Sequence, residues 1–316
     1  MTTPVHVLIT GGCGYVGTKL TQAMLDRTDH LVSVLDTQWF GNHLTPDPRL
    51  TVCAADVRTI DDFDLSRFDT IFHLANIAND PSVDLNPYSS WEVNVLAGMR
   101  LIDRAARQGV KQFIFASSAS VYGLKSDARV TEDLDLVPLS EYNKTKMVAE
   151  RVVMSYAGAM TTTIVRPATV CGCSPRMRLD LVVNLLTMQA LTKGAITVLG
   201  GDQTRPNIHI DDLVDLYLFA FERRLAGVYN AGFENIAVRD IAALITRHVP
   251  AEVTVLPSND PRSYSICSDR LLATGFRPQK DVATAIREMV AAYREGRITD
   301  EVSAYNVNWM KQHNFG

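Results

Sequence analysis

The sequence has no long hydrophobic run and no cluster of positive charge, and it contains only five cysteines. No apolar stretch reaches the roughly 18 residues that a membrane-spanning helix needs. The formal net charge is −4 without a basic run, which argues against a nucleic acid or an anionic membrane as partner. Because Met1 is followed almost at once by the strand-like run Val5–Ile9, there is no room for a signal peptide. We therefore expect a cytoplasmic protein.

The scarcity of cysteines also argues against a disulfide framework or a metal centre. The one close pair, Cys171 and Cys173, has no matching cysteine or histidine cluster. Asp211 and Asp212 after His209 resemble part of a metal site, but here we expect them to cap the next helix and complement its dipole. We predict no bound metal, and buried or half-buried free thiols at Cys13, Cys53, Cys171, Cys173 and Cys267.

A hydrophobic content of 47% is enough for a sizeable core. The first half alternates apolar runs with helical patterns, as in parallel α/β sheets whose two faces are covered by helices. We predict strands near 5–10, 31–36, 50–54, 70–75, 111–117 and 161–166, and helices near 15–27, 88–108 and 141–158. From about residue 167 the elements become shorter, which indicates a smaller C-terminal lobe over the carboxyl ends of the strands.

A glycine-rich turn joins the first predicted strand to the first helix. Gly11, Gly14 and Gly17 would allow a tight turn, close approach of a pyrophosphate and close helix packing, and the helix N-terminus would bind the phosphates. Asp36 ends the second strand, where a ribose-binding acid belongs and would repel a 2′-phosphate. This pattern predicts a Rossmann-type doubly wound sheet that binds NAD rather than NADP. The predicted NAD-binding domain spans 1–170, and 171–316 forms mainly an α/β substrate lobe, with segments of the two interleaved.

Asp56 and Val57 follow the third strand, where they would meet the adenine. The alternative for Asp56 is a helix cap, and the sequence leaves both interpretations open.

Three further side chains indicate the chemistry. Tyr142 and Lys146 are four residues apart on a predicted helix, so we expect the ammonium to lie near the phenol and to lower its pKa. Such a tyrosine can take a proton from a sugar or alcohol hydroxyl. Ser118 ends a central strand upstream of Tyr142. The glycine-rich turn, the serine and the Tyr-Lys pair thus follow one another along the chain in the order expected for this chemistry.

Together these motifs resemble an extended short-chain dehydrogenase/reductase of the NAD-dependent epimerase/dehydratase group, over nearly the whole chain. The resemblance rests on the runs 10–17, 73–76, 117–123, 142–146, 166–170, 201–205 and 209–212, with Asp36, Asp56-Val57 and Asn94. It implies that Tyr142 is the base, that Lys146 lowers the pKa of Tyr142 and holds the nicotinamide ribose, and that Ser118 donates to the nascent carbonyl. Asn94 would hold backbone or a relay water. The implied cofactor-binding residues are Gly11, Gly14, Tyr15, Val16, Gly17, Asp36, Asp56, Val57, Leu74, Ala75, Asn76, Asn94, Tyr142 and Lys146.

The residues beside Ser118 discriminate among reactions of this family. The resemblance implies an Asp and a Glu at these positions in 4,6-dehydratases, whereas this chain has Ala119 and Ser120. It therefore favours a 4-epimerase acting on a nucleotide-diphosphate sugar. Thr169 stands where many epimerases have Asn, so a C4 dehydrogenase or 4-keto reductase remains the alternative. A non-catalytic NAD-sensing protein would not require Ser118, Tyr142 and Lys146 together.

The substrate's pyrophosphate would need cations, which arginine supplies best. The candidate substrate residues are Ser118, Ser120, Thr169, Arg176, Arg178, Asn184, Arg205 and Arg262. Arg176 and Arg178 could instead form surface ion pairs, and Asn184 could lie on an exposed helix face. The family also implies a homodimer built from the helices near 88–108 and 141–158, with Val95, Met99, Ile102, Met147 and Val148 along their faces.

Overall fold

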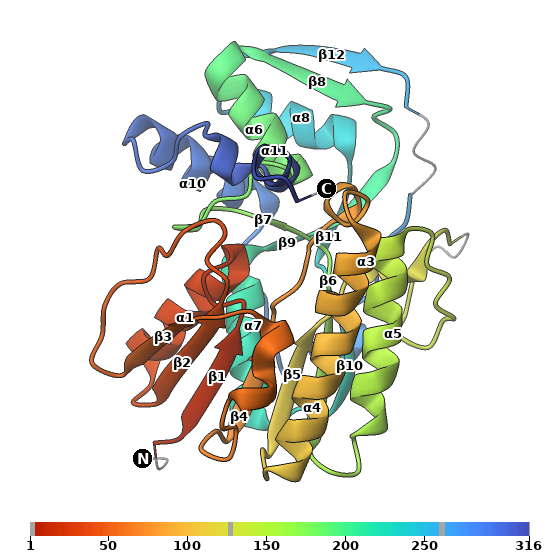
Figure 1. The fold of residues 1–316 in the computed structure, drawn as a ribbon. Helices are drawn as coiled ribbons and strands as arrows, with labels where there is room; N and C mark the ends of the chain where they lie inside the picture. The colour runs from red at the N-terminus through yellow and green to blue at the C-terminus, as the bar shows by residue number, and fades with distance from the viewer. Residues whose placement is uncertain (1–3, 126–128, 259–262, 316) are drawn as a thin grey trace.

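The computed structural model describes residues 4–125, 129–258 and 263–315. Its largest element is a seven-stranded, fully parallel sheet of order β10-β6-β5-β4-β1-β2-β3 (Figure 1). The strands are β1 (His6–Thr10), β2 (Leu31–Asp36), β3 (Leu50–Ala54), β4 (Thr70–His73), β5 (Gln112–Ala116), β6 (Thr161–Pro167) and β10 (Gly227–Ala231). This confirms the predicted Rossmann-type sheet and its first six strands.

Helices cover both faces of this sheet. One face carries α1 (Tyr15–Arg27) and α7 (Ile210–Arg223), which pack beside each other. The other face carries α3 (Pro87–Trp91), the π-helical segment η2 (Glu92–Ala97), α4 (Gly98–Arg107) and α5 (Glu141–Ser155). Successive strand residues alternate between two cores: Val7 and Ile9 face α1 and α7, whereas Leu8 packs with the α4 and α5 side.

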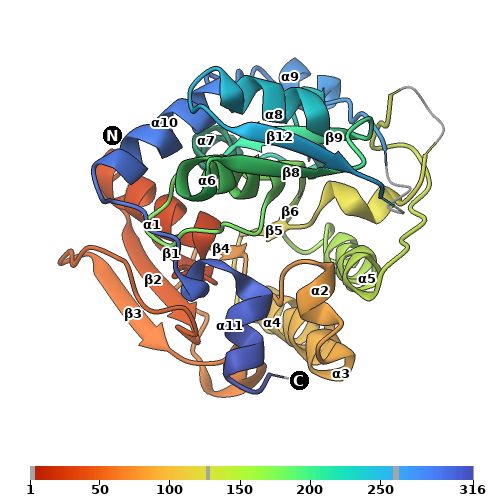
Figure 2. The same cartoon turned by 90° about the horizontal axis from the view of Figure 1, so that it is seen from above.

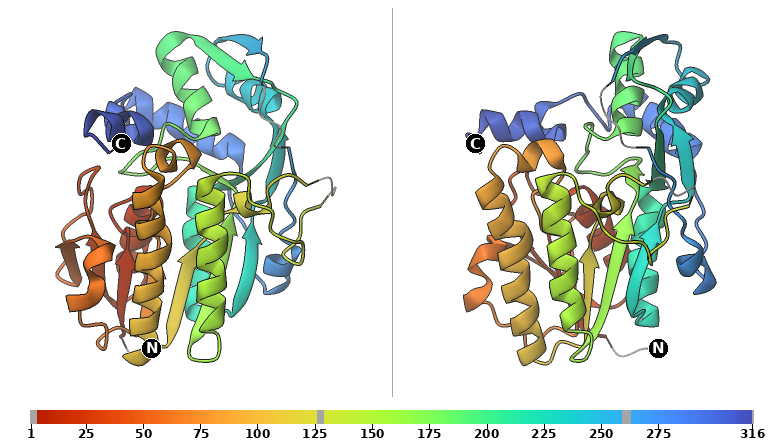
Figure 3. Two further views of the ribbon diagram at one scale, coloured as in Figure 1. Left: turned by 45° about the vertical axis from the view of Figure 1, so that its right-hand side comes forward. Right: turned by 90° about the vertical axis from the view of Figure 1, so that its right-hand side faces the viewer.

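The remaining elements form a lobe above the carboxyl ends of the large sheet (Figure 3). It contains the sheet β11-β9-β7 and the parallel pair β12-β8, which lies at the top of the molecule in Figure 1 and faces the viewer in Figure 2. Their bounds are β7 (Thr169–Cys171), β8 (Ala195–Leu199), β9 (Thr204–His209), β11 (Glu234–Ala237) and β12 (Glu252–Leu256). The helices here are α6 (Val182–Lys193), α8 (Val238–Thr246), α10 (Val282–Arg294) and α11 (Asn306–Gln312), while α9 (Asp269–Ala273) packs near β10.

Short helical turns complete the chain: η1 (Val57–Asp62), α2 (Asp80–Val83), η3 (Ala119–Tyr122) and η4 (Val302–Ala304). The chain returns to the large sheet with α7 and β10 after building β7, α6, β8 and β9, so the two parts share several crossings. None of the helices in the described ranges is long and apolar enough to cross a membrane. All five cysteines are free thiols, buried or half-buried, as predicted.

Candidate active site

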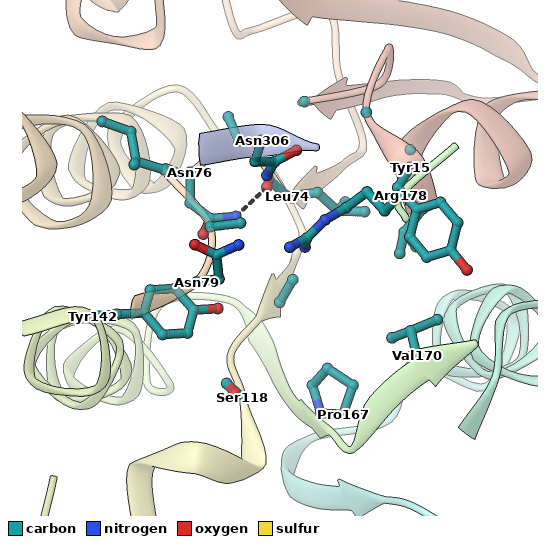
Figure 4. A pocket seen from close by; sticks show the side chains of 18 of the residues that line it. Tyr15, Leu74, Asn76, Asn79, Ser118, Tyr142, Pro167, Val170, Arg178 and Asn306 are labelled. Atoms are coloured by element: carbon teal, nitrogen blue, oxygen red, sulfur yellow. Dashed lines mark hydrogen bonds between the residues drawn. The ribbon is translucent and has the colours of Figure 1, made fainter. Parts of the chain in front are cut away.

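A cavity of about 490 Å³ lies between the carboxyl ends of the sheet and the lobe, within the size range of small-molecule sites. The β1–α1 turn, the ends of β2, β4 and β5, helix α5 and the segment after β7 line it. Figure 4 shows Tyr142 and Ser118 on one side, with Arg178 and Asn306 reaching in from the other. The strands thus bring together residues far apart in the sequence.

The glycine turn has the close packing that a dinucleotide cradle requires. Gly11 has φ +76°, and a Cβ there would lie 2.6 Å from the amide nitrogen of Ala75. A Cβ on Gly17 would collide with the carbonyl oxygen of Gly11. Gly14 is the N-cap of α1 and provides no side-chain cap, so the first amide groups of α1 are left for a ligand. These observations fit a pyrophosphate at this turn.

Asp36 joins the glycine turn to the end of β2. Its carboxylate accepts from the amide of Cys13 at 3.0 Å and from that of Gln38 at 2.7 Å. Burial raises the pKa of Asp36, while these two amides and the nearby Arg176 oppose the rise. The carboxylate lines the cavity next to the turn, as a ribose-binding acid must.

Most of the neighbouring candidates line the cavity, and several also hold the backbone in place. Asp56 and Val57 line the cavity, and Asp56 also caps η1 and forms an ion pair with Arg58 at 2.8 Å. The cap interpretation of Asp56 is therefore correct, and its contact with the adenine stays a prediction. Leu74, Ala75 and Asn76 line the cavity, and the buried Oδ1 of Asn76 has no partner. Asn94, on η2, holds the backbone of Ile77. Its Oδ1 accepts from the Ile77 amide at 2.7 Å, and its Nδ2 donates to the Ile77 carbonyl at 3.1 Å. The structure thus gives Asn94 its backbone-holding role.

The three catalytic candidates face the same cavity from two elements. Ser118 caps η3 and lies 2.8 Å from the Ser120 hydroxyl, Oγ to Oγ. Tyr142 is in the first turn of α5, which Ser140 caps through the amide of Asn143. The Lys146 ammonium donates to the carbonyl of Ala116 at 2.7 Å.

The expected effect of Lys146 on Tyr142 is wrong for this structure. Burial raises the pKa of Tyr142 to about 12, and the group that lowers it most is the Arg178 cation, followed by the Ser118 hydroxyl. Burial lowers the pKa of Lys146 to about 7, with the Glu150 carboxylate acting against the change. The reason is geometric, because the ammonium turns to Ala116 and lies 5.9 Å from the centre of the Tyr142 ring.

A buried ion pair lies next to the strand ends that carry the catalytic candidates. Glu150 accepts from Arg166 at 2.9 and 2.7 Å, and Ser117 donates to the same carboxylate. Arg166 also donates to Tyr122, whose hydroxyl donates to Asn230 at 2.7 Å. Since each member has its partners, the network holds β5, β6 and α5 in fixed positions around Ser118.

The substrate candidates are distributed around the cavity and behind it. Ser120, Thr169, Arg176, Arg178 and Arg205 line it, and Arg262 lies outside the described residues. The surface interpretation of Arg176 and Arg178 is wrong, because both are largely buried. Arg178 binds Asp180 through two hydrogen bonds of 2.9 and 3.0 Å.

Asn184 is fully buried, so its expected alternative on an exposed helix face is also wrong. Its amide group accepts from the Gly172 amide at 3.0 Å and donates to the Tyr15 hydroxyl and the Arg178 carbonyl. These contacts hold the cavity wall in place around Tyr15 and Arg178.

Several lining residues were missed in the sequence. Asn79 has φ 76°, caps α2 and donates to Asp180 at 2.9 Å. An Asn before Asp-Pro is a helix-start signal that could have drawn attention to it. Phe40 and Asn306 also line the cavity. Only the folding of distant segments brings them there, and no local sequence pattern indicates it.

His209, Asp211 and Glu288 lie close enough together to hold a cation. However, Lys280 donates to Asp211 at 2.7 Å and to Glu288 at 2.6 Å, and Lys19 also pairs with Asp211, so lysines already neutralise both carboxylates. The expected cap differs in detail: His209 caps α7 by accepting from the Asp211 amide, while the two aspartates occupy its first turn as expected from the dipole.

Comparisons with known proteins identify the family of the chain. A model of the NAD dependent epimerase/dehydratase family matches residues 7–232. The UDP-glucose 4-epimerase of Corynebacterium glutamicum is 26% identical over 311 residues, covering 90% of this chain and 94% of that protein.

Two solved structures share the fold across most of the chain. The UDP-glucuronic acid 4-epimerase from Bacillus cereus, in complex with UDP-glucuronic acid and NAD, has a TM-score of 0.79 and 26% identity, covering 92% of this chain and 99% of that one. An NAD-dependent NDP-hexosamine 5,6-dehydratase has a TM-score of 0.83 and 26% identity, covering 92% of this chain and 98% of that one. Similar folds therefore support different reactions, and the site residues must discriminate among them.

Proposed function

Because the chain belongs to the NAD-dependent epimerase/dehydratase family, we propose that it is a 4-epimerase of a nucleotide-diphosphate sugar. It is an enzyme of the extended short-chain dehydrogenase/reductase type, and its cofactor is NAD. In the proposed reaction C4 is oxidised to a ketone, the keto sugar rotates within the cavity, and the ketone is then reduced on its other face.

The observation that carries the proposal is the pair of hydroxyls at the cavity, with no acid following the first. Ser118 and Tyr142 line the same cavity, and Ser118 is followed by Ala119 and Ser120. Neither of the latter two can take the C5 proton or protonate a departing C6 hydroxyl. The site therefore supports reversible oxidation of a hydroxyl and leaves the C6 oxygen in place.

Proton transfer falls to Tyr142 in this mechanism. Tyr142 takes the proton from the C4 hydroxyl and later returns it, and the Ser118 hydroxyl donates to the same oxygen as it becomes a carbonyl. Because burial raises the pKa of Tyr142 to about 12, the phenolate depends on the Arg178 cation and on Ser118. The chain supplies both from opposite sides of the cavity.

NAD, when bound, would supply the reversible hydride acceptor for C4. The residues that fit it are the glycine turn at Gly11, Gly14 and Gly17, with Asp36 for the adenosine ribose and Lys146 for the nicotinamide ribose.

Other acids line the cavity, but each has partners that restrain it. Asp180 accepts from Arg178 and from Asn79, and Asp80 accepts from Ser140 at 2.6 Å. A carboxylate held by an arginine is a poor general acid, since the cation favours its ionised form. For Asp180, this contact supports epimerisation over elimination of water.

The test is incubation of the protein with UDP-, GDP- and dTDP-sugars, followed by NMR and mass spectrometry of each product. A C4 epimer of unchanged mass is expected for at least one sugar. Stoichiometric NADH with a product two mass units lighter would instead establish a dehydrogenase. A loss of 18 mass units would establish a dehydratase and contradict the role given to Ala119 and Ser120.

A further inference from the structure

Arg176 is a buried cation whose contacts include no carboxylate. The side chain is only 4% exposed, and it lines the cavity. Its guanidinium donates to the side-chain amide oxygen of Asn306 at 2.5 Å and to the backbone carbonyl of Met177 at 3.2 Å, both neutral groups. Its buried Nε–H has no partner. Within the described part of the chain no ion pair with Arg176 is found.

The contrast with Arg178, two residues later in the same cavity, is informative. Arg178 already has a counter-ion, because both of its contacts to Asp180 are short. Burying a charge without a contacting partner is unfavourable in free energy, and a buried donor without an acceptor adds to this penalty. Burial, followed by the repulsion of Arg178, lowers the pKa of Arg176 to about 9, while the Asp180 and Asp36 carboxylates oppose the change, so the side chain is still a cation at neutral pH. Arg176 therefore has no carboxylate in direct contact, and an anionic ligand can supply that contact.

The position of Arg176 within the cavity indicates which ligand this is. Its guanidinium stacks on the Phe40 ring at 4.0 Å from the ring centre, and Phe40 is four residues after Asp36. Arg176 is also close enough to Asp36 to affect the pKa of that carboxyl group. Asp36 ends β2 and Phe40 follows it, and Asp36 also accepts from the amide of Cys13 in the glycine turn.

The C-terminal helix α11 holds this arrangement. Asn306, its first residue, accepts from Arg176, while Trp309 contacts Phe40 with ring centres 4.7 Å apart. Phe315 contacts Trp39 at 4.2 Å between ring centres. The same helix therefore contacts both the arginine and the aromatic residue on which it stacks. Figure 2 shows α11 beside α2.

We propose that Arg176 binds the pyrophosphate of NAD, held in place by Asn306 and Phe40, and is therefore a cofactor ligand and not a substrate ligand. The N-terminus of α1 and Arg176 then provide donors to the phosphates from two separate parts of the chain. This proposal concerns the cofactor alone, so it stands whether or not the reaction is a 4-epimerisation.

The experiment measures NAD binding to the cofactor-free protein by calorimetry, without any sugar. Arg176→Met should raise the dissociation constant roughly 10- to 100-fold, the effect of losing charge-assisted hydrogen bonds. Asn306→Ala keeps the cation and loses only its brace, so a smaller rise is expected. The matched control is Arg178→Met, which removes an arginine that already has a counter-ion and should change NAD binding far less.

Thermal unfolding separates a ligand role from a structural one. Without NAD, Arg176→Met should have an unchanged or higher Tm, because it removes a buried charge without a counter-ion. Its increase in Tm on adding NAD should be smaller than that of the unchanged protein. A lower Tm without NAD together with a full NAD-dependent increase would show a purely structural residue and overturn the proposal. An unchanged NAD dissociation constant with a raised KM for the sugar would assign Arg176 to the substrate, and equal losses for Arg176→Met and Arg178→Met would also contradict the assignment.

Discussion

At the scale of single residues, the proposed chemistry depends on Tyr142. Tyr142→Phe removes the hydroxyl and leaves the ring in place, so turnover should fall by about 10²- to 10⁴-fold. NAD affinity should be nearly unchanged, because the glycine turn and Asp36 are untouched. Initial rates with an active nucleotide sugar and calorimetry with NAD check the two parts separately. Full activity in this variant would remove Tyr142 as the base.

Asp36 determines the choice of cofactor in this account. NADP should bind much more weakly than NAD, since its 2′-phosphate would meet a carboxylate already fixed by the amides of Cys13 and Gln38. Asp36→Ser removes the negative charge, so the difference between the dissociation constants of NAD and NADP should become smaller. Dissociation constants measured for both dinucleotides test this, and comparable values in the unchanged protein would refute the role of Asp36.

His73 predicts sensitivity to acid. Burial lowers the pKa of His73 to about 3, from an ordinary value of 6.5, and its Nδ1 lies 2.7 Å from the Thr10 hydroxyl. Between these two values the unfolded chain binds the proton and the folded protein does not. The free energy of unfolding should therefore fall as the pH drops from about 6.5 towards about 3, with a slope on the order of 1 kcal/mol per pH unit.

The measurement is urea denaturation across this pH range for the unchanged protein and for His73→Gln. The slopes are compared rather than the absolute stabilities, because the substitution has its own packing effect. Equal slopes would show that His73 does not contribute to the acid sensitivity.

At the scale of elements, the β1–α1 turn leaves no room for a side chain at Gly17. A Cβ in Gly17→Ala would collide with the Gly11 carbonyl, so we expect a loss of about 2 kcal/mol in unfolding free energy and weaker NAD binding. Gly158→Ala is the matched control, because nothing lies within 4 Å of its added Cβ. Urea denaturation of both variants tests this, and equal stability for the two would contradict the turn's packing.

The elements could be predicted where the sequence pattern is local. The apolar runs of β1 to β6 are short, strongly hydrophobic and separated by helices, so their periodicity sufficed. Strand β10 was not predicted, because Gly227–Ala231 is a short run that becomes a strand only by pairing with β6. The predicted helix near 88–108 contains the π-helical η2, which its sequence pattern did not indicate.

At the scale of the whole molecule, the homodimer remains a prediction, with a revised surface. Val95 and Ile102 are buried within the chain, whereas Leu96, Met99 and Met154 are 44%, 42% and 42% exposed on adjacent helices. Leu96→Glu combined with Met99→Glu should convert a dimer to a monomer in light scattering at micromolar concentration. Leu199→Glu, on β8, is the control and should remain dimeric. A monomeric mass for the unchanged protein would contradict the prediction.

Site residues could be predicted only where they belong to a recognisable sequence motif. The glycine turn, Ser118, Tyr142 and Lys146 follow recognisable spacings, so the sequence placed them in one cavity. The contact between Arg176 and Asn306 joins residues 130 positions apart, and no spacing could predict it. The direction of the Lys146 side chain was also beyond the sequence, because the Ala116 carbonyl that holds it belongs to another element.

The central claim is that the hydride removed from C4 returns to the same carbon. The most direct test is a nucleotide sugar that carries deuterium at C4, chosen from those converted in the sugar panel, with the product analysed by NMR and mass spectrometry. The account predicts the C4 epimer with its deuterium retained at C4 and its mass unchanged. Deuterium recovered in released NADH, with a keto sugar as product, would contradict it.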